Sequence, residues 1–472
     1  MHLIDYLVFI VYFLGMMAFG VYFYRKNKGS DEYYVGGRSI NFWHIGLSAV
    51  ATDVGGGFSI GLGGLGFIMG LSGSYLLFTG LVGAWMSAVL LIPRVKNLST
   101  LQNFRTFPQF FGYHYNAKVA LVAGIISAIG YLGFTSSQLL SGTKLATAAF
   151  PDVSQNTLLL IMGGIAVGYT VLGGLKAVIY TDTVQWILLL VGLIFIGLPL
   201  SYISVGGWEE IRRILPPEHF SMTNVSGVQL LNWAVTIIPI WFIGMTLYQR
   251  IYAARDEKSA KKAWFLAGLL EWPVMAFMGT ALGMLSRVAY EQNAFALLGF
   301  AAGTGMDEEM GLPLLLVNIL PVGLLGIMLS AYFSAILSTA DSCLMAASGN
   351  VTTDLLGKFI PKNLRAELKM GQVVTLVLGA TAVILAWKLE NVLTIMLQSY
   401  AVMVGGLLIP TIAIISGRKG SSTAAFSAII TGGGSTLLLQ QLEFQPYGLD
   451  PLLFGLAISG VVFWITKKNT HN

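Results

Sequence analysis

The chain has 472 residues, of which 55% are hydrophobic and only 10% are charged, and its mean hydropathy is +0.74. Soluble domains carry about 25% charged residues, so this composition excludes a soluble globular protein and predicts a polytopic membrane protein. The net charge is +5, and the single cysteine, Cys343, excludes an internal disulfide framework.

Thirteen stretches of the chain are apolar over about the 20 residues that a membrane span requires. Helices are expected throughout, because the backbone groups of a segment in lipid must be hydrogen-bonded within it. The first stretch lacks a basic leader region and is long enough to span, so we interpret it as a membrane helix and not as a cleavable signal. The predicted spans are 3–24, 41–70, 73–92, 117–149, 157–175, 177–203, 229–249, 262–287, 313–344, 370–387, 391–416, 422–440 and 451–466.

The basic residues predict the orientation of these spans in the plasma membrane, because cytoplasmic loops are enriched in lysine and arginine. If the N-terminus lies outside, most of the 27 basic residues, Arg250 among them, fall in cytoplasmic loops, and the C-terminus is cytoplasmic. The positive charge therefore reflects topology rather than a nucleic-acid partner. Lys144, near the outer end of its span, is expected to extend its amine outward. The outer-loop acids Asp307, Glu308 and Glu309 are expected to be solvated.

The sequence AVATDVGGGFSIGLGGLG, residues 49–66, places an aspartate and many glycines inside a predicted span. A charged side chain in mid-membrane costs about 2.5–3.5 kcal/mol on the insertion scale, so such residues are generally paired or functional. A packing face of small residues explains the glycines but not Asp53. An interrupted helix explains both, because freed carbonyls and a carboxylate then line a cavity, and we favour this interpretation.

A second break is predicted in residues 237–250, where Pro239 and Gly244 flank Trp241, five spans after the first. Breaks at corresponding positions are typical of transporters built from two inverted repeats. The predicted all-α organisation is an N-terminal helix and loop, a five-helix repeat, an outer loop, a second five-helix repeat and two C-terminal helices, with boundaries 1–40, 41–203, 204–228, 229–416 and 417–472.

Hydroxyls and a carboxylate gather in SAILSTADSCLMAAS, residues 334–348. Ser338, Asp341 and Ser342 share one face of a helix, and Na⁺, as a hard cation, prefers oxygen ligands. Serine and threonine also bond the carbonyls of their own helix, so the added aspartate carries the argument. For Glu271, another acid within a span, a structural pair and a proton site are both open.

Several segments, in order along the chain, carry a resemblance to one family. GGLKAVIYTDTVQ, residues 173–185, agrees at full length with the signature G-G-x-x-A-V-x-x-T-D-x-x-Q, and it is accompanied by YYVGGRSI, SAVATDVGGGF, YQRIYAARDEKSAKKA and FSAILSTADS. These motifs resemble the sodium/solute symporters. The resemblance implies Na⁺-driven uptake by about thirteen helices with an inverted five-plus-five core like that of the LeuT fold.

The resemblance also implies ion sites at matching positions. One Na⁺ site would take carbonyls and hydroxyls from Ala51, Val54, Ala335, Ser338 and Thr339. A second Na⁺ site, seen in some members, would use Asp182, Ser338, Asp341 and Ser342. An aspartate at 341 stands where serine is usual, which would strengthen this site or let it take a proton. Asp53 matches an acid that proline-carrying members use for sodium.

The expected substrate is a small polar organic solute, and we favour an amino acid or a similar zwitterion. Sugar-carrying members tend to have an amide-rich stretch where this chain has Ile243, Gly244 and Met245, and choline-carrying members have a tryptophan in place of Asp53. Na⁺-coupled uptake of a sugar, a choline-like compound or an organic acid, and proton-coupled symport, are alternatives. The candidate cavity residues are Phe58, Tyr75, Gln138, Trp241, Gln398 and Tyr400.

Two other classes compete with a transporter. A channel usually lines its pore with rings of charges or carbonyls from several subunits, whereas two broken helices in one pseudo-repeated chain favour alternating access. A transporter-like sensor typically carries an extra signalling domain, which we do not expect here. No motif indicates an enzyme or a cofactor besides one or two Na⁺ as coupling ions. The expected partners are the solute and the lipid bilayer, without nucleic acid or an obligatory protein partner.

Overall fold

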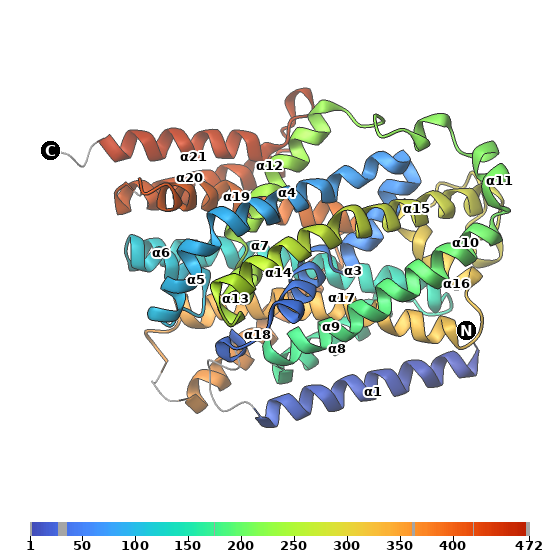
Figure 1. Ribbon diagram of the computed structural model, residues 1–472, viewed down its shortest axis with the longest axis horizontal. Coiled ribbons are helices and arrows are strands. Elements are labelled where there is room, and N and C mark those ends of the chain that lie inside the picture. Colours follow the sequence, from blue (N-terminus) through green and yellow to red (C-terminus); the bar gives the residue numbers. More distant parts are fainter. Residues whose placement is uncertain (1, 27–34, 174, 361–363, 419, 469–472) are drawn as a thin grey trace.

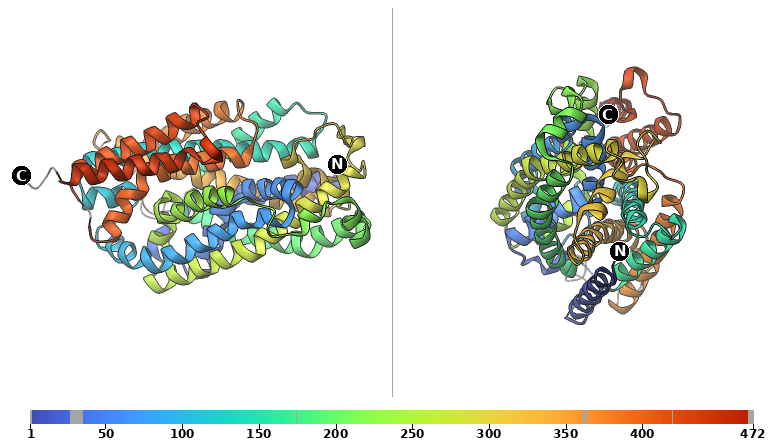
Figure 2. Two further views of the ribbon diagram at one scale, coloured as in Figure 1. Left: turned by 90° about the horizontal axis from the view of Figure 1, so that it is seen from above. Right: turned by 90° about the vertical axis from the view of Figure 1, so that its right-hand side faces the viewer.

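The computed structural model describes residues 2–26, 35–173, 175–360, 364–418 and 420–468. Within these ranges the chain is mainly helical, and the long helices run along the longest axis of the molecule (Figures 1 and 2). The start of α1 (Leu3–Lys26) and the end of α21 (Pro451–Lys468) lie at opposite ends of that axis (Figure 1). An odd number of membrane crossings requires this arrangement.

Each predicted span except 313–344 overlaps one helix or a run of consecutive helical segments. Besides α1 and α21, the single helices are α3 (Phe42–Met69), α4 (Tyr75–Leu90), α7 (Ala117–Ala149), α8 (Gln155–Gly173), α18 (Leu364–Ala386), α19 (Val392–Ile415) and α20 (Ser422–Gln441). The composite spans are α9 (Leu175–Gly192) with η3 (Leu193–Gly197) and α10 (Leu198–Ser204), α12 (Gly227–Ile243) with α13 (Met245–Ala253), α14 (Glu257–Leu269) with η5 (Leu270–Met275) and α15 (Ala276–Glu291), and α17 (Leu324–Gly349) with η8 (Asn350–Leu355).

Short helical elements occupy the connections. They are α5 (Ile92–Leu101), α6 (Phe107–His114), α11 (Gly207–Ile214) and α16 (Gly311–Ile319), with the single turns η1 (Gly36–Arg38), η2 (Gly70–Ser74), η4 (Pro217–Phe220), η6 (Ala296–Leu298), η7 (Glu308–Met310) and η9 (Pro446–Gly448). Helices α5 and α6 lie at the end of the bundle where α21 ends, and α11 lies at the opposite end (Figure 1).

The number of helices that meet the length and hydropathy of a membrane span is smaller than the number of predicted spans. Eight helices in the described part of the chain are long and apolar enough to cross a membrane, or nine if the bent pair α12–α13 is one span. The count of thirteen therefore stays a prediction. The predicted span 313–344 is wrong in its first part, because α16 is a separate helix that ends at Ile319. Pro321 and Gly323, which has φ of 87°, stop the helix before α17 begins at Leu324.

Both predicted helix breaks are confirmed, although the second lies at the glycine and not at the proline. Helix α3 leaves helical geometry at Gly55, which has φ of 53° and ψ of 176°. This backbone conformation favours glycine, because a Cβ atom is strained there. Helices α12 and α13 bend by 41° at Gly244, whose ψ of 116° is extended, whereas Pro239 lies inside α12.

The glycines beyond the first break serve helix packing. Residues 49–66 therefore combine both interpretations: the helix is interrupted at Gly55, and the glycines after it form a packing face. A methyl group on Gly66 would overlap the backbone of Thr280 on α15. Close approach of two helix backbones is the usual role of small residues in membrane helices. The second half of α3 is thereby held against α15, while its first half meets α9, α14 and α17.

The broken helices lie inside the bundle. Helices α3, α7 and α17 run through its centre, whereas α1 and the pair α20–α21 lie at opposite edges (Figures 1 and 2). Helix α17 packs against α3, α7 and α9, and every described residue of α17 from Met328 to Gly349 is buried. The two segments that the sequence singles out, 49–66 and 334–348, are therefore neighbours in the core.

Candidate ion and solute site

The break in α3 faces hydroxyl and carbonyl oxygens of α17. Thr339 Oγ1 lies 3.0 Å from the carbonyl oxygen of Ala51 on α3 and 3.0 Å from that of Ala335, one turn earlier on its own helix. A methyl group on Gly55 would lie 2.9 Å from the same hydroxyl, so the glycine permits this approach. The structure thus brings together three residues of the predicted first Na⁺ site. The other two, Val54 and Ser338, are buried beside them in the chain.

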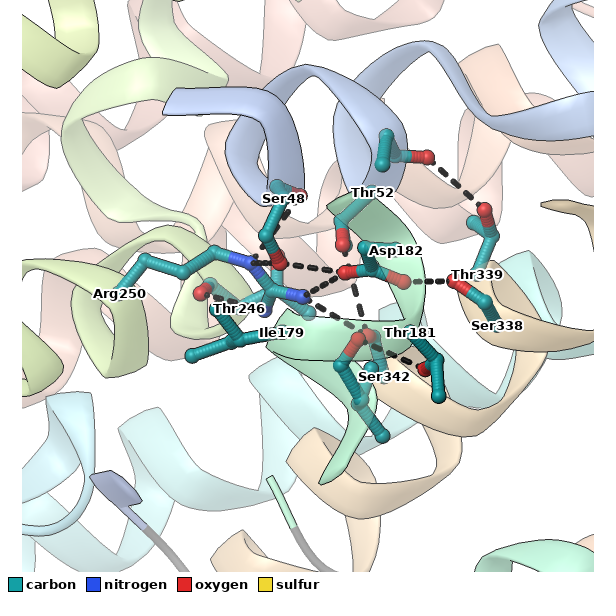
Figure 3. A network of polar contacts seen from close by, with 12 residues as sticks. Ser48, Thr52, Ile179, Thr181, Asp182, Thr246, Arg250, Ser338, Thr339 and Ser342 are labelled. Carbon is teal, nitrogen blue, oxygen red and sulfur yellow. Dashed lines mark hydrogen bonds and ion pairs between the residues drawn. The ribbon is translucent and has the colours of Figure 1, made fainter. Parts of the chain in front are cut away.

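A guanidinium occupies a second polar cluster of the core (Figure 3). Arg250, on α13, is fully buried, and its Nη2 lies 3.4 Å from Asp182 Oδ2 and donates to Ser342 Oγ at 2.9 Å. Its Nε donates to Ser48 Oγ at 3.0 Å, and its Nη1 donates to the carbonyl of Thr246 at 3.1 Å. The positive charge is therefore held by a carboxylate, two hydroxyls and backbone oxygens from several helices.

Asp182 is the anionic partner in this cluster. The hydroxyls of Ser48 on α3 and Ser338 on α17 donate to its two carboxylate oxygens, one to each (Figure 3). Asp182 is fully buried on α9. A buried carboxylate with a guanidinium and two hydroxyl donors has its charge and its hydrogen-bonding capacity satisfied by the protein.

The predicted second Na⁺ site is thus divided in the structure. Asp182 and Ser342 contact Arg250, and Ser338 contacts Asp182 (Figure 3). Asp341 has another partner: its Oδ1 accepts a hydrogen bond of 2.5 Å from Thr170 Oγ1 on α8. The guanidinium was not predicted to lie in this cluster, because Arg250 directly follows the predicted span 229–249 and was therefore expected in a cytoplasmic loop. The only signal for its burial is its position in the second broken span, directly after the apolar run that Gly244 interrupts.

Asp53 lies two residues before the α3 break and is only 4% exposed. Tyr400, on α19, donates its hydroxyl to Asp53 Oδ1 at 3.3 Å. The carboxyl of Glu271, from η5, faces that of Asp53. Glu271 is 0% exposed, and neither of its oxygens meets a hydrogen-bond donor in the described part of the chain. Glu271, which the sequence left unassigned, is therefore a member of this site.

Two of the predicted cavity residues lie at the break. Gln138, on α7, is buried, and its Oε1 would lie 3.3 Å from a methyl group on Gly55. Tyr400 reaches Asp53, as described above. Both side chains come from helices that pack directly against α3. Their position fits contact with a solute held at the broken helix.

The other predicted cavity residues are placed differently. Trp241 is fully buried against Gly83 of α4 and Trp264 of α14, with the two indole rings 5.9 Å apart. Tyr75 is half-buried beside Phe78 at the start of α4, 6.1 Å between ring centroids. Gln398 is exposed, and its carbonyl accepts from Gln440 on α20, so its assignment to an internal cavity is wrong. The side chain of Phe58 lies outside the described residues.

Two of the charges expected to be solvated, Lys144 and Glu309, form a buried ion pair instead, whereas Asp307 is exposed as expected. Lys144 Nζ lies 2.6 Å from Glu309 Oε2 and 2.6 Å from Asp307 Oδ2, and Lys144 and Glu309 are 3% and 2% exposed. Glu309 also accepts from the backbone N–H groups of Val392 and Leu393 at 2.8 and 2.9 Å, in the first turn of α19. An acid is favourable at a helix N-terminus, so Glu309 joins α7 to α19.

Two broken membrane helices with carbonyl, hydroxyl and carboxylate oxygens at their breaks define a secondary transporter with its site inside the bundle. The profile of the sodium:solute symporter family matches residues 33–432. The chain belongs to the sodium:solute symporter family, and it is an integral membrane protein that couples solute symport to Na⁺.

Named relatives and a solved structure agree with this assignment. The chain is 29% identical over 476 residues to the sodium/proline symporter of Escherichia coli, covering 98% of this chain and 92% of the relative. It is 26% identical over 460 residues to the high-affinity proline transporter PutP of Bacillus subtilis, covering 94% and 93%. A Na⁺-coupled sialic acid symporter in a substrate-bound outward-open state superposes with a TM-score of 0.80 at 20% identity, covering 99% and 98%. That likeness shows the fold.

Proposed function

We propose that this symporter carries a small amino acid or similar zwitterion into the cell together with Na⁺, with L-proline as the first candidate. The observation that carries the proposal is the meeting of the α3 break with α17, where Thr339 reaches the Ala51 carbonyl close to buried Asp53. Similarity to two proline carriers over nearly the whole chain supports the choice of solute. The N-terminus would lie outside and the C-terminus in the cytoplasm.

Na⁺ would bind among the carbonyls of Ala51, Val54 and Ala335 and the hydroxyls of Ser338 and Thr339. These oxygens come from α3 in the first predicted repeat and α17 in the second, so a bound cation ties the repeats together. If the solute also favours the tied arrangement, each ligand raises the affinity for the other. Entry of one Na⁺ at about 100 mV contributes about 2.3 kcal/mol from the voltage alone.

The position of Arg250 supports a structural role for Asp182. The Arg250 guanidinium places a positive charge near Asp182 and Ser342, where the predicted second Na⁺ would bind. A Na⁺ at that position would be repelled by the guanidinium at short range. We therefore assign a single Na⁺ to the contact between α3 and α17, next to Thr339 and Ser338.

Uptake into proteoliposomes tests the proposal. The purified protein is reconstituted, and uptake of labelled L-proline, other amino acids, choline, a sugar and an organic acid is measured with an inward Na⁺ gradient, and without Na⁺ at an imposed pH gradient. We expect uptake of a zwitterionic amino acid only with Na⁺. Uptake that is indifferent to Na⁺ but driven by the pH gradient would overturn the coupling, and uptake of only the sugar or choline would overturn the solute class.

A matched pair of threonines tests the site. Thr339→Ala removes the hydroxyl that reaches Ala51, whereas Thr381→Ala removes an exposed hydroxyl that bonds only the i−4 carbonyl of Val377 at 2.9 Å. Both threonines bond their own helix, and only Thr339 contacts α3. Thr339→Ala should raise the Na⁺ concentration for half-maximal uptake about tenfold, the equivalent of about 1.4 kcal/mol, and Thr381→Ala should leave it unchanged. Equal behaviour of the two variants would exclude Thr339 as a ligand.

A further inference from the structure

The buried acids of the core differ in what balances their charge. Asp182 faces Arg250 and two hydroxyl donors, and Glu309 faces Lys144 and two backbone N–H groups. Asp53 and Glu271 face each other, and Tyr400 is the hydroxyl donor recorded for Asp53. In the described part of the chain no Lys or Arg pairs with either of these two acids. A buried charge is normally paired or coordinates a metal ion.

We propose that Asp53 and Glu271 together bind a second Na⁺, with the Tyr400 hydroxyl as a further oxygen ligand. This inference rests on the proposed function, and it adds a cation site that is separate from the Arg250 cluster. The oxygens of Glu271 are fully buried and meet no hydrogen-bond donor among the described residues, and its carboxyl adjoins that of Asp53; together these observations point to a ligand that the two acids share. Oxygen donors of this kind are those that a hard cation prefers.

The surroundings of Glu271 are shaped to hold a carboxylate in this position. Gly80, on α4, leaves the room that Glu271 Oε2 occupies, because a methyl group on Gly80 would overlap that oxygen. The backbone leaves helical geometry directly after Glu271, at Trp272, with φ of −136° and ψ of 123°. Pro273 accounts for this irregularity, because the residue before a proline favours extended backbone. The room that Gly80 leaves is therefore the feature that serves the Glu271 carboxylate.

The burial favours a small metal ion over the other cations that two carboxylates attract. Exposures of 0% and 4% leave no open surface on which the ammonium group of a solute could dock. A proton shared by the two acids would satisfy one oxygen of each and leave the second oxygen of Glu271 without a partner, whereas a metal ion is coordinated by several oxygens at once. Among the described residues no group of three or more His, Cys, Asp or Glu is suited to a metal ion, and a pair of carboxylates suits a monovalent ion.

Equilibrium binding of ²²Na⁺ to the purified full-length protein, without solute, tests the proposal. We expect two Na⁺ per wild-type chain and one for Glu271→Gln, whereas Thr339→Ala should keep two sites, one of them with about tenfold lower affinity. Gly80→Ala displaces the Glu271 carboxylate without removing it and should also bind one. Matched controls are Glu209→Gln, an exposed acid of α11, and Gly164→Ala, where a methyl group meets nothing within 4 Å; both should bind two.

The outcomes separate this inference from the proposed function. One Na⁺ in the wild type whose affinity falls in Thr339→Ala but is unchanged in Glu271→Gln and Gly80→Ala overturns the inference and leaves the proposed function intact. Absence of Na⁺ binding in the wild type overturns both. Two Na⁺ in Glu271→Gln, with loss of L-proline binding or of proton uptake on binding, assigns Glu271 to the solute or to a proton and also overturns the inference. If Glu271→Gln does not fold, Gly80→Ala decides by the same criterion.

Discussion

The Asp182 cluster and the Asp53–Glu271 pair lie in the same helical core, on helices that contact α3, yet their carboxylates have different partners. Asp182 receives a guanidinium and two hydroxyls from within the protein. Asp53 receives one tyrosine hydroxyl, and Glu271 receives no donor in the described residues. The first cluster is complete without an added ion, and the second is not.

This difference separates a structural charge from a ligand-binding one. A buried ion pair whose hydrogen bonds are satisfied contributes little beyond a well-packed apolar alternative, but removing one partner is strongly destabilising. A buried acid without a partner destabilises the ion-free protein, and binding of a cation removes this destabilisation. Asp182 and Glu271 are both fully buried acids, but their substitution is therefore expected to change the unfolding temperature in opposite directions.

The largest effect is expected for Arg250→Met, which leaves the Asp182 charge without a counter-ion. Breaking a buried pair costs about 3–5 kcal/mol, measured as a lower thermal unfolding midpoint of the detergent-solubilised protein. Adding Asp182→Asn to Arg250→Met should recover much of the loss. The control is Arg213→Met: the Arg213 side chain is 70% exposed, and its pair with Glu210 should contribute less than about 1 kcal/mol. Equal midpoints for Arg250→Met and wild type would show that the cluster is not an ion pair.

The opposite sign is expected for Glu271→Met in Na⁺-free buffer. Removing an unsatisfied buried group recovers about 1–3 kcal/mol, so this variant should unfold at the same or a higher temperature than wild type, whereas Asp182→Asn unfolds at a lower one. Addition of Na⁺ should then raise the midpoint of wild type more than that of Glu271→Met. A Glu271→Met variant as destabilised as Asp182→Asn would remove the distinction between the two regions.

A smaller effect is expected for Tyr400→Phe, which removes the hydroxyl that Asp53 accepts. One hydrogen bond contributes about 0.5–1.5 kcal/mol, so the affinity for ²²Na⁺ should fall by up to about tenfold without loss of a binding site. Tyr113→Phe, at a 53% exposed tyrosine of α6, is the matched control and should leave the affinity unchanged. An unaltered affinity in Tyr400→Phe would leave the two carboxylates as the only side-chain ligands.

The smallest effect concerns Lys96, a buried cation of α5 in the predicted cytoplasmic loop 93–116, whose Nζ donates to the Tyr252 carbonyl at 3.0 Å. Burial, and then the Arg38 guanidinium, lower the pKa of Lys96 to about 8, while Asp256 acts in the opposite direction. An unfolded lysine has a pKa of about 10.4.

The unfolded chain therefore binds more protons than the folded one between about pH 8 and pH 10, and the stability contribution of Lys96 rises with pH in that window. From pH 7 to pH 9 the unfolding midpoint of wild type should rise relative to that of Lys96→Met. Parallel pH dependences for the two proteins would show that the Lys96 charge is solvated in the folded state.

Several features of the site were predictable because they are encoded locally. A charge beside glycines in an apolar run, as at Asp53 and Gly55, indicates a broken helix irrespective of distant residues. Gly244 marks the second break in the same way, and the spacing of Ser338 and Thr339 places their hydroxyls in one helical turn. Each of these signals depends on backbone preference or helical periodicity, which neighbouring residues determine.

The burial of Arg250 and Lys144 could not be predicted from their neighbours in the sequence. Hydropathy places Arg250 at the end of a span and Lys144 near an outer surface, and both positions normally indicate a solvated group. Their burial depends on Asp182 and Glu309, which lie far away in the sequence. The prediction for Gln398 fails for a related reason: it lies two positions before Tyr400, and two positions along a helix turn a side chain to nearly the opposite side, away from the cavity.

By itself, the sequence determined the membrane environment, the helical class, the two breaks and the family, because composition, glycine conformation and motif spacing are properties of short stretches. Only the tertiary structure decided which acids are already balanced and which are not. Coulomb interactions and hydrogen bonds act between groups that the fold brings within a few ångströms. The packing of the helices therefore decides that Asp182 has a counter-ion and that Glu271 has none.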